Sequence, residues 1–248
     1  MFSRSQIEKF LFFDIETAGG TSTLMELSEK LEKLWAQRCQ YLRSINTHPE
    51  NATMSDDQLF LEKAGLQAEF GKIVCISFGK VKFPDDPDLP PTIQIVSYAG
   101  EDEKEILIQA FKVFNGMAKN KIMPFGHNIK RFDIPYLCKR AFINGLEPAL
   151  PLQVWDKKPW EIDVKDSSEL WSFGAWQEGF TSLDLLTAVL GLPSPKEEMQ
   201  GNQVHSNFWN GNISGIKEYC QKDVLSLIRV TFALSFIDQF DDANVIYK

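Results

Sequence analysis

Four acidic residues in three separate segments of this 248-residue chain could act together in catalysis. Asp14 and Glu16 are two positions apart, Asp133 lies near the middle of the chain, and Asp223 follows Tyr219 by four positions. A cluster of carboxylates costs stability, because like charges at close range raise one another's pKa. A pair of divalent cations would reverse that cost, since hard cations bind carboxylate oxygens. The four acids therefore predict a site that holds two cations for cutting a phosphodiester bond.

The first two acids lie in a predicted strand. Residues 10–16 are apolar apart from these acids, which is typical of a strand buried on both faces. Alternate side chains of a strand share a face, so Asp14 and Glu16 project to the same side. Phe13 and Ile15 project to the other side. Two carboxylates placed in this way can bind one metal ion.

Tyr219 and Asp223 lie in a long predicted helix over residues 213–236. Their spacing of four positions places both side chains on one face of that helix. An apolar stripe runs beside them and can dock the helix on a sheet: Ile216, Cys220, Val224 and Leu227. The pair then points along the edge of the buried face, where acids carried by a strand could meet it.

Each acid also has a simpler structural explanation when it is taken alone. Asp14 could end a strand or cap a turn. Asp133 comes just before a predicted helix start and could be its N-cap. Tyr219 and Asp223 could form a half-exposed helix pair. The three segments in this order, each in a suitable structural context, favour one shared site instead.

The remaining pattern predicts an α/β fold. Further strands are expected at 72–80, 92–98, 121–126 and 161–165. Further helices are expected at 102–118, from about Ile134 to Asn144, and at 182–190. Strands and helices in this order predict one mixed sheet with helices on both faces.

The segment 21–66 is unusual for a connection between two strands. Leu24, Leu27, Leu31 and Leu34 follow helical spacing, and a second short helix fits 57–65. We expect a helical insertion between the first and second strands. Extra packing against the sheet is the favoured explanation for it, and a lid or a dimer contact is the alternative.

The composition limits the binding partners. The net charge is −8 and the pI is about 5.0, which argues against binding duplexes through a broad basic surface. A single strand entering a metal-lined cleft remains compatible with this charge. Four local bases could help to steer phosphates: Lys130, Arg131, Lys139 and Arg140.

The same composition predicts a cytoplasmic protein with a large core. Hydrophobic residues make up 44% of the chain, including 19 Phe and 6 Trp, so a packed interior is expected. No apolar run reaches the roughly 18 residues of a membrane span, and we expect neither a span nor a signal peptide. The four cysteines form no C-x-x-C pair, which indicates reduced, mostly buried thiols.

The three acidic segments resemble the exonuclease motifs of the DEDD superfamily, whose fold is ribonuclease H-like. Asp14-x-Glu16 is similar to motif I, NIKRFD with Asp133 to motif II, and Tyr219-x-x-x-Asp223 to the tyrosine form of motif III. FGHNIKRFDIPYL is especially similar to the corresponding segment of the proofreading domain in family B DNA polymerases. The whole chain, including SLDLLTAVLGLPSPK, resembles predicted stand-alone bacterial 3′–5′ exonucleases related to that domain.

The resemblance implies one 3′–5′ exonuclease domain over residues 1–248, built on a five-stranded ribonuclease H-like sheet. It also implies two Mg²⁺ or Mn²⁺ ions. Asp14, Glu16 and Asp223 would hold one ion, while Asp14 would bridge to a second ion supported by Asp133. Tyr219 would orient the attacking water. The products would be nucleoside 5′-monophosphates released from a 3′ end.

The resemblance further implies residues that grip the terminal nucleotide. These are the backbone at Thr17 and the side chain of Asn128. Phe132 could stack on a base, although a role in the core is favoured for it. The expected partner is the 3′ end of single-stranded DNA, with RNA possible; protein partners are not predicted.

Four other residues near these motifs are expected to have structural roles. Asp166 and Asp184 have the spacing of helix caps rather than of additional metal ligands. His127 and His205 are expected to be structural, since a tyrosine-type motif III needs no histidine base.

Two alternatives to a DNA exonuclease stay open. An exoribonuclease or oligonucleotide-trimming enzyme would use the same motifs, because recognition of the 2′-hydroxyl depends on cleft shape. A catalytically silent nucleic-acid-binding module would keep the fold without the chemistry. The presence of all four acids and of Tyr219 argues against that second alternative.

Overall fold

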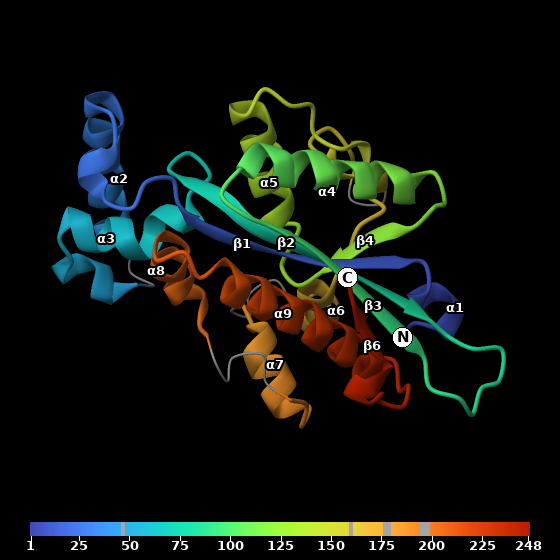
Figure 1. The fold of residues 1–248 in the computed structure, drawn as a ribbon. Helices are drawn as coiled ribbons and strands as arrows, with labels where there is room; N and C mark the ends of the chain where they lie inside the picture. Colours follow the sequence, from blue (N-terminus) through green and yellow to red (C-terminus); the bar gives the residue numbers. More distant parts are fainter. Residues whose placement is uncertain (46–47, 159–160, 176–179, 194–198) are drawn as a thin grey trace.

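A computed structural model of the protein describes residues 1–45, 48–158, 161–175, 180–193 and 199–248. Within these residues, six strands form one mixed sheet in the order β5-β4-β1-β2-β3-β6 (Figure 1). The strands are β1 (Phe10–Gly19), β2 (Gly71–Lys82), β3 (Thr92–Ala99), β4 (Met123–Gly126), β5 (Lys165–Asp166) and β6 (Val245–Tyr247). This sheet is compatible with a ribonuclease H-like fold.

Strand β1 lies inside the sheet and has two different neighbours. It runs antiparallel to β2 and parallel to β4, and β4 runs parallel to β5. The carboxyl ends of parallel strands lie at the same edge of a sheet. The first two acids of β1 therefore lie just beyond its last pair with β4, Phe12 with Phe125, near the point where the chain leaves β4 toward Asp133.

The helices cover both faces of the sheet, with α4 and α5 on one face and α9 on the other (Figure 1). The described α-helices are α1 (Arg4–Ile7), α2 (Glu29–Ser44), α3 (Asp56–Lys63), α4 (Glu103–Ala118), α5 (Asp133–Ile143), α6 (Ser167–Ser172), α7 (Leu183–Val189), α8 (Val204–Trp209) and α9 (Ile213–Leu234). Short 3₁₀ helices lie at Leu24–Glu26, Pro49–Thr53, Ala64–Leu66, Leu150–Leu152, Gly201–Gln203 and Asp242–Asn244. None of the described helices combines the length and the apolar composition that a membrane crossing requires.

Alternation along β1 divides the core into two layers. Phe13 and Ile15 pack in the apolar cluster that includes α4 and α5, whereas Phe10 and Phe12 pack in the cluster that includes α9. Burying one such side chain stabilises the fold by about 1.5–3 kcal/mol. The same alternation places Asp14 on the α9 side, as the sequence predicts.

The insertion between β1 and β2 has a small core of its own. One face of α2 buries Trp35, Cys39 and Leu42 against α3. The predicted leucine stripe is wrong as a packing face, because Leu31 and Leu34 are 37% and 41% exposed. The insertion also packs against the sheet, as the favoured explanation predicts, because a Cβ atom at Gly65 would lie 3.2 Å from the Thr17 backbone oxygen of β1. A second face of α2 is left uncovered.

The sheet differs from the prediction at its two edges. The predicted five strands become six, because β6 pairs with β3 near the C-terminus. The predicted strand 161–165 is displaced: only Lys165 and Asp166 pair, with β4. Ile162 and Val164 still pack against the core, so their apolar spacing reflects burial rather than strand pairing.

Candidate active site

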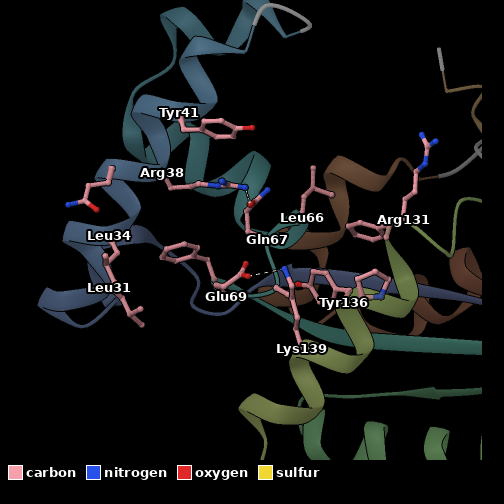
Figure 2. A pocket seen from close by; sticks show the side chains of 15 residues that line it. Leu31, Leu34, Arg38, Tyr41, Leu66, Gln67, Glu69, Arg131, Tyr136 and Lys139 are labelled. Atoms are coloured by element: carbon pink, nitrogen blue, oxygen red, sulfur yellow. Dashed lines mark hydrogen bonds and ion pairs between the residues drawn. The ribbon is translucent and has the colours of Figure 1, made fainter. Parts of the chain in front are cut away.

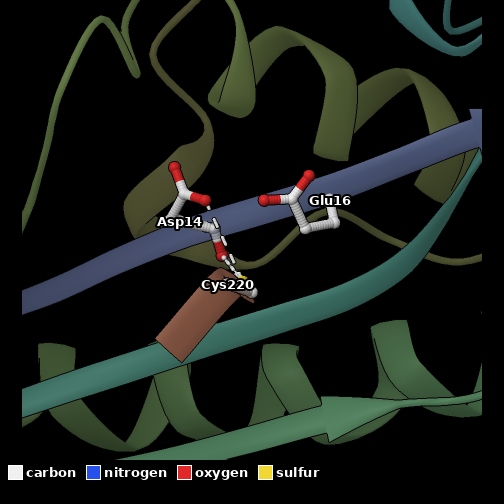
Figure 3. A group of neighbouring side chains, drawn as sticks. All are labelled: Asp14, Glu16 and Cys220. Carbon is white, nitrogen blue, oxygen red and sulfur yellow. Dashed lines mark hydrogen bonds between the residues drawn. The ribbon is translucent and has the colours of Figure 1, made fainter. Parts of the chain in front are cut away.

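Asp14 and Glu16 lie side by side on β1, next to Cys220 of α9 (Figure 3). Asp14 is opposite Ser77 and Glu16 is opposite Cys75 of β2. The pairing shifts between Glu16 and Thr17, and such an irregularity bends a strand and changes the direction of its side chains. The strand thus presents two carboxylates directly before its pairing shifts.

Cys220 of α9 completes a compact group with these two acids, which the sequence did not predict. Its thiol donates a hydrogen bond to the backbone oxygen of Asp14 at 3.5 Å and lies 3.9 Å from Asp14 Oδ2. One ligand atom each of Asp14, Glu16 and Cys220 lies within 4.8 Å of the others. The stripe that contains Cys220 is buried, as predicted, but the stripe alone did not indicate which carboxylate the thiol would reach.

A glycine on β2 allows α9 to approach the sheet closely. A Cβ atom at Gly79 would lie 2.7 Å from Val224 Cγ1 and 2.9 Å from Ile228 Cδ1. Any side chain at this position would push α9 outward. The close contact holds Tyr219 and Cys220 near the carboxylates of β1.

Asp133 reaches the same region from the start of α5. It is the first residue of that helix and is only 4% exposed. The prediction that it could be the N-cap is wrong, because Phe132 occupies the N-cap position. The backbone N–H groups of Asp133 itself and of Ile15 donate hydrogen bonds to its carboxylate, so the side chain lies against the strand that carries Asp14 and Glu16.

The carboxylates share one electrostatic environment. Burial raises the pKa of Asp14 well above its ordinary value, and the charges of Asp223 and Asp133 raise it further. Burial also raises the pKa of Glu16, followed by the charges of Asp14 and Asp223. These mutual effects are in keeping with one shared environment for the acids of the three segments.

Asp133 belongs to the same electrostatic group. Burial is the main cause that raises its pKa to about 8, and the charges of Asp166 and Asp223 add to this effect. The backbone hydrogen bonds of its carboxylate act in the opposite direction. Without a cation, this carboxyl group therefore retains its proton to near-neutral pH.

Tyr219 lies beside the acids and is 6% exposed. Burial is the first cause that raises the pKa of its phenol, followed by the charges of Asp223, Glu16 and Asp14. A hydrogen bond with the Asp223 carboxylate acts in the same direction. The hydroxyl is therefore neutral at physiological pH and acts as a hydrogen-bond donor rather than as a base.

The donor set fits hard divalent cations. Within the described part of the chain, no lysine or arginine forms an ion pair with Asp14, Glu16 or Asp133, so these carboxylates lack a positive partner. Burial also raises the pKa of the Cys220 thiol, and a protonated thiol is a poor metal ligand. Carboxylate oxygens remain as donors, and these suit Mg²⁺ or Mn²⁺.

Two of the three predicted substrate contacts lie beside the acids. A cavity of about 120 Å³ is lined by Glu16, Thr17, Leu66 and Phe132 among others. Phe132 is half-buried and also packs against the core, so a core role and contact with the cavity coexist. Asn128 is absent from the described residues that line this cavity.

Asn128 instead belongs to a tightly held loop before α5. Its backbone has a left-handed φ of 64°, a conformation that asparagine tolerates better than most residues. The Asp166 carboxylate accepts hydrogen bonds from the backbone N–H groups of Asn128 at 2.8 Å and Lys130 at 3.2 Å. It also caps α6 through the N–H of Ser168 at 3.0 Å. The capping prediction for Asp166 is confirmed, but its second role in holding this loop was missed.

The other structural assignments are mixed. His127 contacts the Ser167 hydroxyl and the Thr181 carbonyl oxygen, and His205 accepts a hydrogen bond from the backbone N–H of Gly19. Both histidines are structural, as predicted. The predicted cap at Asp184 is wrong: Ser182 caps α7, and Asp184 lies in its first turn.

Three of the four bases expected to steer phosphates are already paired with acids. Lys130 pairs with Glu169 and Lys139 pairs with Glu69, at 2.6 and 3.0 Å. Arg140 forms a buried pair with Glu103, so its role is structural. Arg131 is exposed and has no ion-pair partner among the residues that the structure describes.

A family model described as a predicted 3′–5′ exonuclease related to the exonuclease domain of PolB matches residues 64–237. The matched span contains Asp133, Tyr219 and Asp223, and it begins after Asp14 and Glu16. Strand β1 nevertheless pairs with β2 and β4, which both lie inside the span. None of the curated proteins compared with the chain matches it.

Proposed function

Because the chain belongs to the family of predicted 3′–5′ exonucleases related to the exonuclease domain of PolB, we propose that it trims single-stranded DNA from the 3′ end with two divalent cations. The family makes it a hydrolase with a nucleic-acid substrate. The observation that carries the proposal is the convergence of Asp14, Glu16 and Asp133 with Asp223, whose charge raises the pKa of each of the other three. Such a cluster is costly without cations and useful with them.

We assign the cation ligands as the motifs suggest. Asp14, Glu16 and Asp223 would hold one cation, and Asp14 with Asp133 would hold the second. When bound, the two cations lower the pKa of a water molecule and balance charge on the attacking and leaving oxygens. Without metal, burial favours the protonated forms of Asp14 and Glu16, because it raises their pKa values. Cation binding therefore requires these protons to be released.

Tyr219 would position the water rather than deprotonate it. Its raised pKa keeps the phenol protonated, and its hydrogen bond with Asp223 fixes the hydroxyl beside the acids. A neutral hydroxyl at this place can orient a water molecule for in-line attack. With an ordinary pKa of about 10, little phenolate is present at neutral pH, and burial lowers that fraction further by raising the pKa.

The terminal nucleotide would be held at the cavity beside Glu16. Thr17 and Phe132 line this cavity and would contact the sugar and the base. Asn128 would act from the loop that Asp166 holds in place. A base stacked on an aromatic ring is bound with little sequence preference, so we propose broad sequence tolerance. The exoribonuclease alternative uses the same residues.

A labelling experiment tests the proposal. Single-stranded DNA and RNA, each labelled at the 5′ or the 3′ end, are incubated with the protein and Mn²⁺. Stepwise shortening of the 5′-labelled strand with early release of a labelled mononucleotide from the 3′ end is expected, faster for DNA. The matched controls are Asp14→Ala, expected to be inactive, and Asp85→Ala, an exposed acid in a turn.

The outcomes separate the alternatives. Faster trimming of RNA would identify an exoribonuclease. Binding of either strand without cleavage would identify a silent binding module and contradict the proposed function. The described cysteines are all unpaired thiols, which supports our further proposal that the protein works in the reducing cytoplasm.

A further inference from the structure

A second, larger cavity opens next to the one beside Glu16. It has a volume of about 710 Å³ and lies between the uncovered face of α2 and the start of α5 (Figure 2). This volume is within the range of about 300–1,000 Å³ typical of small-molecule pockets, so it can take nucleotide units. We call it the insertion groove. Its lining includes Leu34, Arg38, Tyr41, Arg131, Phe132 and Lys139.

The insertion groove and the smaller cavity are adjacent. Leu66 and Phe132 line both of them. The smaller cavity contains Glu16, so the path from the acids passes over these two apolar side chains and enters the groove. A strand with one end at the acids could therefore reach the groove by crossing Leu66 and Phe132.

The charge of the insertion groove is opposite to that of the whole chain. The chain carries a net charge of −8. The described lining of the groove instead contains three bases, Arg38, Arg131 and Lys139, and one acid, Glu69. Lys139 is paired with Glu69, but both side chains are 56% exposed, so a phosphate can compete for the lysine. Arg131 has no ion-pair partner within the described residues. This local excess favours a polyanion.

Aromatic and apolar side chains lie between these bases. The guanidinium of Arg38 lies 4.8 Å from the ring centroid of Tyr41, and it donates a hydrogen bond to Gln67 that fixes its position. Tyr41 and Leu66 are 55% and 52% exposed. Alternating rings and bases along a groove are typical of proteins that stack the bases of a single strand and contact its phosphates.

We propose that the insertion groove binds the nucleotides on the 5′ side of the scissile phosphate. The helical insertion would thus act as a clamp for a single nucleic-acid strand, with Tyr41 as a stacking platform and Arg38 and Arg131 as phosphate contacts. This inference rests on the proposed function, because that function places the 3′ end at the acids. It explains why α2 leaves Leu31 and Leu34 uncovered although its other face is packed.

Binding measured without catalysis tests the clamp. The Asp14→Ala protein in EDTA is titrated with 5′-fluorescent oligothymidylates and oligouridylates of about two to twelve nucleotides, read by anisotropy. Affinity is expected to rise with length until the groove is filled. Adding Tyr41→Ala is expected to weaken binding of the longer strands roughly 5- to 100-fold, the range for one lost base stack.

A charge-reversal variant provides a second test of the clamp. Arg131→Glu is expected to weaken binding and to reduce the salt dependence of the affinity, because one phosphate contact is lost. Lys112→Glu on α4 and Trp155→Ala are matched controls, since both residues are exposed and lie outside the two cavities. Melting curves of all variants confirm folding; the altered groove residues are at least partly exposed.

The outcomes distinguish the clamp from the proposed function. An affinity independent of length, or Tyr41 and Arg131 variants that bind like the parent, would overturn the clamp while wild-type cleavage still supported the nuclease. Length-dependent binding through the groove by a wild-type protein that never cuts would support the clamp and contradict the nuclease. A dimer that Leu34→Glu dissociates without changing strand affinity would also overturn the clamp.

Discussion

Asp14 has a raised pKa and is also the proposed ligand of both cations. Burial and the charges of Asp223 and Asp133 raise its pKa, so its carboxylate is unfavourable in the metal-free protein. Asp14→Ala is expected to abolish cleavage while leaving the free energy of unfolding in EDTA near or above that of the wild type. End-labelled cleavage and urea melts check both parts. Retained cleavage would rule out the assignment, and Asp85→Ala controls for the loss of an acid elsewhere.

Tyr219 tests positioning separately from metal binding. Its neutral hydroxyl bonds to Asp223, and phenylalanine keeps the ring while removing only this group. Tyr219→Phe is expected to lower kcat by roughly 10- to 1000-fold, the range for one positioning or proton-handling group. The Mn²⁺-induced rise in melting temperature should remain. A wild-type kcat would exclude the role.

The residue types at the candidate site could be predicted from the sequence because the site depends on local spacing. Two positions along a strand and four along a helix fix which face Asp14, Glu16, Tyr219 and Asp223 share. Cys220 could not be assigned to the site, because its thiol reaches Asp14 across the interface between α9 and β1. That contact depends on how closely two elements pack, and spacing alone does not define it.

At the scale of elements, Asp166 links β5 to the loop that leads into α5. Asp166→Ala leaves the N–H groups of Asn128 and Lys130 without their carboxylate acceptor, and lost hydrogen bonds to a charged group should cost roughly 2–4 kcal/mol of unfolding free energy. Asp166→Asn keeps one acceptor oxygen and should cost less. Denaturant melts measure both values. Equal stability of Asp166→Ala and the wild type would contradict the positioning role.

The elements that were predicted well are long and strongly periodic, such as β1 and α9. The errors lie in short or two-sided elements. Strand β6 has three residues, too few for a period to be recognised, and it forms because β3 offers an edge. Helix α2 has a packed face and a groove face, so the leucine spacing identified the exposed side instead of the buried one. Packing partners decide such cases, and the local sequence does not contain them.

At the scale of the whole molecule, the acid cluster should control how stability depends on pH. The folded-state pKa values of Asp14, Glu16 and Asp133 lie above their ordinary values of 3.8, 4.5 and 3.8. Between about pH 4 and pH 8 the folded state therefore holds more protons than the unfolded state. The stability that these three groups contribute is fully present below pH 4. The free energy of unfolding then falls as the pH rises through their folded-state pKa values.

Melting curves in EDTA check this sign. The wild type is expected to lose more stability than Asp14→Asn between pH 5.5 and pH 8. Added Mn²⁺ should raise the melting temperature more at pH 8 than at pH 5.5, because protons compete with the cation for the carboxylates. Equal shifts at both pH values would contradict a buried carboxylate site.

Anomalous scattering from crystals grown with millimolar Mn²⁺ is the most direct measurement of whether these carboxylates form a cation site. Two peaks are expected in contact with carboxylate oxygens, one shared by Asp14, Glu16 and Asp223 and one by Asp14 and Asp133. The same crystals of Asp14→Ala should lose at least one peak. Manganese bound only elsewhere, or no peak beside Asp14, would contradict the nuclease mechanism.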